Sequence, residues 1–168
     1  MSKLRRTVLL LVACAAASFV IATAATPAQA WTWNQNVTVY NSGGLCVQGQ
    51  AGIDHVTPGG FSGNLAYAGT YARGGGCGAG LANQYAAVRL DVYRWNGSAW
   101  VVCRSTAWTY GYTGVNQWGP TGPEQVYNYG GPASCGAGWY GTLAASYVLD
   151  SGGTWRGGTV WSGQEFVS

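Results

Sequence analysis

The chain has few side chains that could transfer a proton: a single histidine, His55, and five carboxylates. Asp54 precedes His55 directly, and a carboxylate beside an imidazole can orient it as a general base. Neighbouring residues of an extended chain point to opposite sides, however, so this pair favours an ordinary polar loop. Glycoside cleavage needs two carboxylates at a defined separation. No sequence spacing singles out such a pair among Asp54, Asp91, Glu124, Asp150 and Glu165.

One string, Asp150-Ser151-Gly152-Gly153, matches the core of the nucleophile motif of trypsin-like proteases, and His55 precedes it as in that family. Leu149 replaces the leading glycine of the motif, and only 15 residues follow Gly153. Asn41-Ser42-Gly43-Gly44 is nearly the same string, which favours a hairpin turn in both places over a triad defined by geometry. We therefore expect no enzyme, with a hydrolase as the alternative, and neither cofactor nor metal.

Aromatic residues offer a different chemistry, because stacking and neutral hydrogen bonds can hold a ligand. Asn96-Gly97 lies between two alternating runs and predicts a type I′ hairpin turn that pairs Trp95 with Ser98 and Tyr93 with Trp100. The core face of this hairpin would hold Val88, Leu90, Val92, Val101 and Cys103. The opposite face is our candidate binding surface: Arg89, Asp91, Tyr93, Trp95, Trp100 and Arg104. The alternative is that these aromatic residues are cross-strand pairs that only stabilise the sheet.

Two parts of the chain resemble one another and suggest a duplicated unit. Cys46 is followed by Cys77-Gly78-Ala79-Gly80, and Cys103 by Cys135-Gly136-Ala137-Gly138, with offsets of 57 and 58 residues. If each unit, about 37–80 and 90–138, closes its own bridge, the disulfides are Cys46–Cys77 and Cys103–Cys135. Each would be worth about 3–4 kcal/mol in the chain-entropy model. The crossed pairings remain open at this stage.

The elements that must position these residues are strands. Glycine, Val, Thr, Trp and Tyr at short alternating spacings predict an all-β fold, a sandwich or barrel. The expected strands span residues 35–41, 45–51, 64–73, 85–95, 99–109, 124–129, 140–149 and 154–166. The strands that follow the second unit would form a C-terminal hairpin. Residues 54–63 and 110–123 are expected to be a corresponding pair of long loops.

The N-terminal 30 residues have the form of a signal peptide: a basic start, an apolar run and the small-x-small site Ala28-Gln29-Ala30. Lipidation at Cys14 is the competing interpretation. Cleavage would leave one secreted, extracellular domain, 31–168. Three of the eight basic residues, Lys3, Arg5 and Arg6, leave with the leader, so five arginines face five carboxylates. Zero net charge excludes the basic stripe that nucleic acid needs, and we expect no membrane contact after cleavage.

The chain from Trp31-Thr32-Trp33-Asn34 through Trp155-Arg156-Gly157-Gly158 to Trp161-Ser162-Gly163 resembles small secreted β-rich proteins of filamentous actinobacteria. The activities of that group are largely uncharacterised. The resemblance implies export and a disulfide-bonded β fold, and it implies no particular activity.

Three functions fit these observations. The first is a secreted, non-enzymatic binding module whose partner is a protein or a polysaccharide. The second is a secreted antagonist: a toxin component, an adaptor in an exported assembly, or an inhibitor that presents the 111–123 loop. The third is a structural cell-surface protein, since low charge and many aromatic residues suit self-association equally well.

Overall fold

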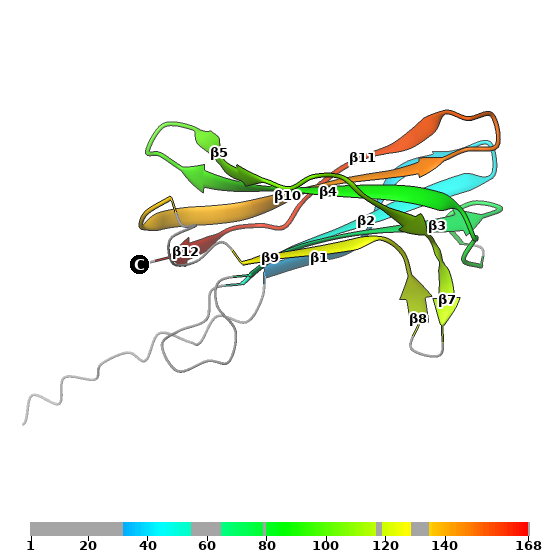
Figure 1. Cartoon of the computed structure of the whole chain (residues 1–168), viewed down its shortest axis with the longest axis horizontal. Coiled ribbons are helices and arrows are strands. Elements are labelled where there is room, and N and C mark those ends of the chain that lie inside the picture. Colours follow the sequence, from blue (N-terminus) through cyan, green and yellow to red (C-terminus); the bar gives the residue numbers. More distant parts are fainter. Residues whose placement is uncertain (1–31, 55–64, 79, 117–118, 129–134, 168) are drawn as a thin grey trace, which may run out of the picture.

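The protein is a sandwich of two antiparallel β-sheets. The computed structural model describes residues 32–54, 65–78, 80–116, 119–128 and 135–167. These residues form strands and turns without a helix. The two sheets lie face to face (Figure 1), which confirms the all-β prediction. The leader with Cys14, and His55, lie outside the described residues.

The four-stranded sheet is built from three strands of the first half of the chain and one later strand. Its order is β1 (Thr32–Ser42), β2 (Leu45–Asp54), β3 (Leu65–Gly74) and β9 (Glu124–Asn128). Gly43 and Gly44 join the first two strands as a two-residue turn, with φ of 60° and 78°. This is the primed turn geometry that side chains resist and glycine adopts freely.

The six-stranded sheet is centred on two long antiparallel strands, β4 (Tyr85–Trp95) and β10 (Gly138–Leu149). Each outer position is shared by two shorter strands. Beside β10 lie β11 (Trp155–Trp161) and β12 (Glu165–Val167), and beside β4 lie β5 (Trp100–Ser105) and β6 (Thr109–Tyr112). The β4–β5 hairpin rises away from the other sheet at one end of the molecule, while the β10–β11 hairpin lies beside the β1–β2 hairpin at the opposite end (Figure 1).

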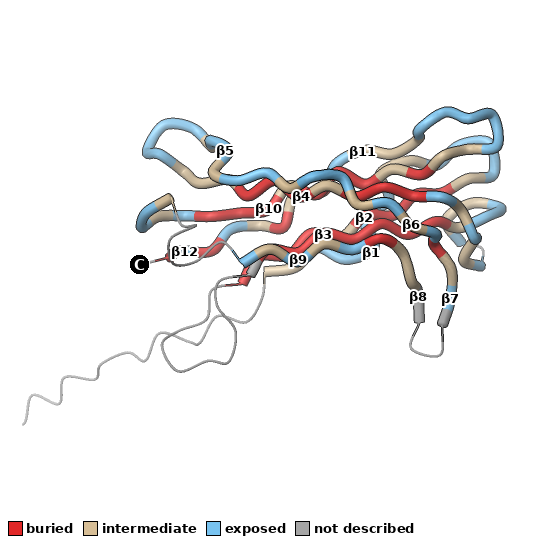
Figure 2. Tube along the Cα trace, viewed as in Figure 1, coloured by how far each residue is buried: buried red, intermediate tan, exposed pale blue. Residues whose placement is uncertain are grey.

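The core lies between the sheets, where small residues allow close approach. Figure 2 shows the buried positions along the middle of both layers. The buried apolar cluster contains Ala51, Ile53, Ala66, Ala68, Val88, Leu90, Val92, Tyr140, Ala144, Val160 and Val167. Two buried hydroxyls bond across the gap, Thr70 to the carbonyl of Ala87 and Ser146 to that of Gly69, both at 3.1 Å. These bonds satisfy polar groups that would otherwise be costly to bury.

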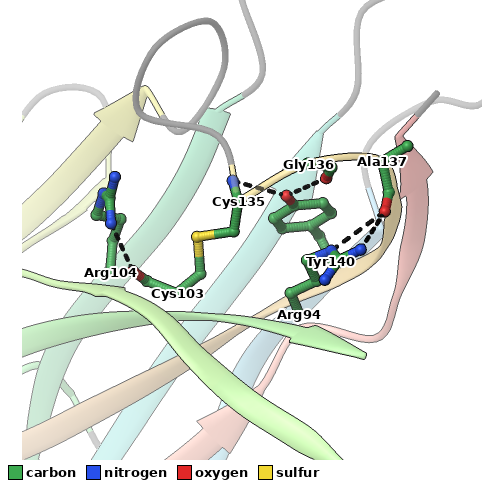
Figure 3. The surroundings of a disulfide bond; sticks show 7 residues. All are labelled: Arg94, Cys103, Arg104, Cys135, Gly136, Ala137 and Tyr140. Carbon is green, nitrogen blue, oxygen red and sulfur yellow. Dashed lines mark hydrogen bonds between the residues drawn. A yellow bond between two sulfur atoms is a disulfide. The ribbon is translucent and has the colours of Figure 1, made fainter. Parts of the chain in front are cut away.

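Both disulfides pair as the repeat suggested, Cys46–Cys77 and Cys103–Cys135. Figure 3 shows the second bridge beside the ring of Tyr140. The Tyr140 hydroxyl donates to the carbonyl of Gly136 at 2.5 Å and accepts from the backbone N–H of Cys135 at 3.0 Å. Arg94 donates to the carbonyl of Ala137 from Nε and Nη2. The second Cys-Gly-Ala-Gly string is therefore a turn held by β4 and β10, while the duplication remains a prediction.

The register predicted for the β4–β5 hairpin is wrong. Trp95 pairs with Trp100 and Tyr93 with Val102, because residues 96–99 form a four-residue loop. Gly97 has φ of 101°, but Asn96 does not take the positive φ that a type I′ turn needs. The side chain of Asn96 instead accepts from the backbone N–H groups of Ser98 and Ala99, both at 2.9 Å. This side-chain cap explains the longer loop.

A bulge between the pairs made by Val92 and Tyr93 shifts the rest of β5, so that Arg104 lies opposite Val92 and not opposite Arg89. Val92 faces the core, and Arg104 is thereby removed from the predicted binding surface. Val101 also departs from its predicted core position. It is exposed on the edge strand β5, and its partner Arg94 is only partly buried.

The predicted loop over 110–123 is wrong in part. It contains the end of β6 and a small hairpin of β7 (Gly114–Asn116) and β8 (Gly119–Thr121), which projects from one end of the sandwich (Figure 1). Buried Thr113 anchors the base of this hairpin by donating to the carbonyl of Ala82 at 2.5 Å. Of the other predicted loop, 54–63, Asp54 ends β2 and the remainder lies outside the described residues.

Candidate functional site

The outer surface of the six-stranded sheet is the most aromatic surface of the described chain. Strand alternation places the odd-numbered residues of β4, β10 and β11 on this side, because the even-numbered ones supply the core. We call this surface the aromatic face. Its rings come from β4, β5, β6, β10, β11 and the β5–β6 connection: Tyr85, Tyr93, Trp95, Trp100, Trp108, Tyr110, Tyr112, Trp139, Tyr147, Trp155 and Trp161.

At the β4–β5 end, four of these rings form the hairpin cluster: Tyr93, Trp95, Trp100 and Trp161. Trp100 is central, with its ring centroid 5.8 Å from that of Trp95 and 5.0 Å from that of Trp161. Tyr93 contacts Trp161 edge-on at 5.8 Å. The Trp161 ring lies over Gly141, where a Cβ atom would come within 2.5 Å of Cη2. The absence of a side chain at residue 141 therefore sets the position of this ring.

At the opposite end, a second group of rings surrounds a groove of about 340 Å³. We call it the groove cluster: Trp108, Tyr110, Tyr147 and Trp155, with Ala87 as a small residue among them. Tyr110 lies 6.0 Å from Trp155, and Trp108 contacts Tyr147 edge-on at 5.9 Å. Tyr110 is 53% exposed and Trp155 40%, so these rings are available to a ligand. A contiguous exposed apolar surface of this kind is typical of a binding site.

Between the two clusters lies an ion pair. Arg89 Nη2 donates to Asp91 Oδ2 at 2.9 Å, and Asp91 is 5% exposed although it lies on the outer side of the sheet. The Arg89 guanidinium also lies over the Trp108 ring, 5.3 Å from its centroid. A cation placed in this way is attracted to the ring face. The aromatic face therefore carries a polar centre between two stacking surfaces.

A smaller hollow of about 270 Å³ extends the hairpin cluster toward the chain end. It is lined by Trp95, Trp100, Trp139 and Gln164. Trp139 packs edge-on against Phe166 at 5.4 Å, and both rings are exposed. Rings are therefore presented from one end of the sheet to the other.

The structure brings five of the six predicted site residues together on one face: Arg89, Asp91, Tyr93, Trp95 and Trp100. Arg104 is the exception. The sequence interpretation missed Trp161 and the groove cluster, because their place on the same face depends on β10 pairing with β4 and β11. The alternation of Tyr147, Trp155 and Trp161 with small residues is the sequence signal that could have identified them.

The outer side of the four-stranded sheet differs in character. Its tyrosines are buried: Tyr67 stacks on Trp33 at 4.5 Å, and Tyr71 donates to Glu124 at 2.8 Å. Burial is the main cause that raises the pKa of Tyr71 from 10.0 to about 12, and it raises the pKa of Tyr67 as well. These rings stabilise the sheet, and they offer less to a ligand than the exposed rings of the aromatic face.

The Asp150–Gly153 string forms the β10–β11 turn. Asp150 Oδ1 accepts from the backbone N–H groups of Gly152 and Thr154, and Oδ2 accepts from Arg156 Nε at 2.9 Å. The bond from Arg156 is the main cause that lowers the pKa of Asp150. Every bond described for this carboxylate serves the turn. Asp91, by contrast, lies in the middle of β4.

No cluster of three or more metal-binding side chains occurs among the described residues, and none of their elements is a helix capable of crossing a membrane. Comparison of the chain with protein-family models, curated proteins and solved structures finds no match. The residues of the aromatic face are therefore the basis for a functional proposal.

Proposed function

We propose that the chain is an exported, non-enzymatic binding module that holds a neutral polysaccharide on its aromatic face. The observation that carries this proposal is the row of aromatic rings on either side of the Arg89–Asp91 pair, mostly exposed in the groove cluster and half-buried in the hairpin cluster. Pyranose rings present C–H surfaces that stack on aromatic side chains, and their hydroxyls need polar groups within the same site. Ligand sites in general combine apolar surface with a few placed polar groups.

The length and charge of the surface support an extended, uncharged ligand. The 11 residues of β4 span about 33 Å, which accommodates several sugar rings in a row. The mature chain has five arginines and five carboxylates, so its zero net charge favours neither acidic nor basic partners. The disulfides are compatible with the proposed extracellular location.

A protein partner is the second candidate, and a particular observation favours it. β5 is an edge strand with exposed Val101 and Val102 directly beside the hairpin cluster. Such an edge can add a strand from another chain, with Trp100 as an anchor at the interface. An antagonist or a self-associating surface protein would use the same edge.

A pull-down with insoluble cellulose, xylan, mannan and chitin tests the proposal. We expect the mature protein to bind at least one of these polymers, and binding to persist at high salt because stacking is not ionic. Two double variants, Trp95→Ala/Trp100→Ala and Tyr110→Ala/Trp155→Ala, should each weaken binding about tenfold or more.

The matched control is Val126→Ala, an exposed apolar residue on the outer side of the other sheet. It should bind as wild type does. Failure of the folded wild-type protein to bind any of the four polymers would overturn the glycan proposal and favour the protein partner.

A further inference from the structure

The ion pair in the aromatic face is incompletely bonded. Arg89 and Asp91 share one hydrogen bond, from Nη2 to Oδ2, and not the two parallel bonds that an arginine and a carboxylate can form. Arg89 Nε and Asp91 Oδ1 are both buried, and neither has a hydrogen-bond partner within the described residues. The pair therefore presents one unused donor and one unused acceptor.

Leaving such groups unpaired is costly, because each loses its hydration without compensation. A hydroxyl can match both through a single oxygen, which accepts from Arg89 Nε while its hydrogen is donated to Asp91 Oδ1. A carbonyl or an ammonium could satisfy one of the two atoms and would oppose the other. The chemistry of the pair therefore favours an alcohol.

Trp108 limits access to the Arg89 side of the pair, because its ring lies over the guanidinium. The backbone on either side of this residue is fixed, because Gln125 Nε2 donates to the carbonyl of Ala107 at 2.6 Å and to Thr109 Oγ1 at 2.7 Å. Rotation of the Trp108 side chain would uncover the guanidinium of Arg89. Its ring is exposed on the groove side and so has space to move.

We propose that Arg89 and Asp91 are the specificity-determining residues of the aromatic face and bind one free hydroxyl of a sugar ring. This inference rests on the proposed function, and it adds the requirement for an unsubstituted hydroxyl between the two stacking clusters. The rings supply most of the contact area without distinguishing one sugar from another, and the pair supplies the discrimination.

The test compares two probes by isothermal titration calorimetry: cellohexaose, or the hexasaccharide of whichever polymer binds in the pull-down, and the same compound after complete O-methylation. Methylation keeps the ether oxygen as an acceptor and removes the donated hydrogen. We expect the wild-type protein to bind the methylated probe about tenfold more weakly or worse.

Arg89→Lys keeps the positive charge and removes the donor at Nε. It should bind both probes with similar, weak affinity, so that the discrimination disappears. The matched control, Arg104→Lys, changes an exposed arginine of the same sheet that lies away from the aromatic face. It should discriminate as the wild-type protein does.

The outcomes separate the two proposals. Binding of neither probe by the wild-type protein would overturn the proposed function. Equal binding of both probes by the wild-type protein would overturn the role of the pair and leave stacking intact. If Arg89→Lys fails to fold, as judged by circular dichroism, the wild-type comparison decides on its own.

Discussion

Substitution of Gly141 by Ala tests how the hairpin cluster is built. A Cβ atom at residue 141 would lie 2.5 Å from Trp161 Cη2 and 2.6 Å from the carbonyl oxygen of Gly163. Carbon atoms pack at about 3.5–4.0 Å, and Trp161 Cζ2 lies closer still than Cη2, so the ring must retreat by roughly 1–2 Å. Overpacking of this kind costs about 1–3 kcal/mol, which lowers the melting temperature by roughly 4–12 °C for a domain of this size.

Thermal denaturation and near-ultraviolet circular dichroism measure the two consequences, the lower stability and the displaced indole. Gly74→Ala is the control, because its Cβ would meet Ala82 at an ordinary 3.5 Å. That variant should stay within about 0.5 kcal/mol of wild type. Removing the ring as well, in Gly141→Ala/Trp161→Ala, should cost less than the two single changes added together. Additive losses, or a Gly141→Ala protein of native stability and spectrum, would refute the packing argument.

Three further predictions concern the scaffold. Replacing Cys103 and Cys135 by Ala releases a 32-residue link and should lower the free energy of unfolding in urea by about 4 kcal/mol; a loss below 1 kcal/mol would contradict this. Because the folded pKa of Tyr71 is raised from 10.0 to about 12, its contribution to stability is complete below pH 10 and is lost as pH rises through about 12. Tyr71→Phe should flatten that alkaline decline in a series of urea titrations, and an unchanged slope would count against the assignment. The pKa of Asp150 is lowered in the folded state. Its pairing with Arg156 therefore stabilises the fold above the unfolded pKa of about 3.9, and this stabilisation is lost as pH falls through the folded pKa. Wild type should therefore exceed Asp150→Asn in stability at pH 7 and match it in strong acid, whereas a constant difference would disprove the linkage.

Local patterns were sufficient to predict most of the fold. Alternation of apolar residues located the strands, and the repeated cysteine strings indicated both disulfides. Turn chemistry was less decisive. The primed turn predicted at Asn96-Gly97 occurs instead at Gly43-Gly44, because the Asn96 side chain can bond to its own loop and a glycine has no such alternative.

The candidate site was predicted where it depends on one strand and missed where it depends on pairing between distant strands. Tyr93 and Trp95 alternate along β4, so their common face was visible in the sequence. Trp161 joins them only because β11 packs beside β10 and β10 beside β4. The bulge that removes Arg104 is equally non-local, since it reflects how β5 fits its neighbour.

Binding of a polysaccharide to the aromatic face can be followed at the indole N–H resonances of the tryptophans. The measurement is a two-dimensional 1H–15N spectrum of the labelled mature protein, recorded during titration with the hexasaccharide that matches the polymer bound in the pull-down. We predict that Trp95, Trp100 and Trp155 shift in proportion to ligand, while Trp33, on the opposite sheet, stays unchanged. Shifts confined to Trp33, or none at all at saturating ligand, would contradict the account.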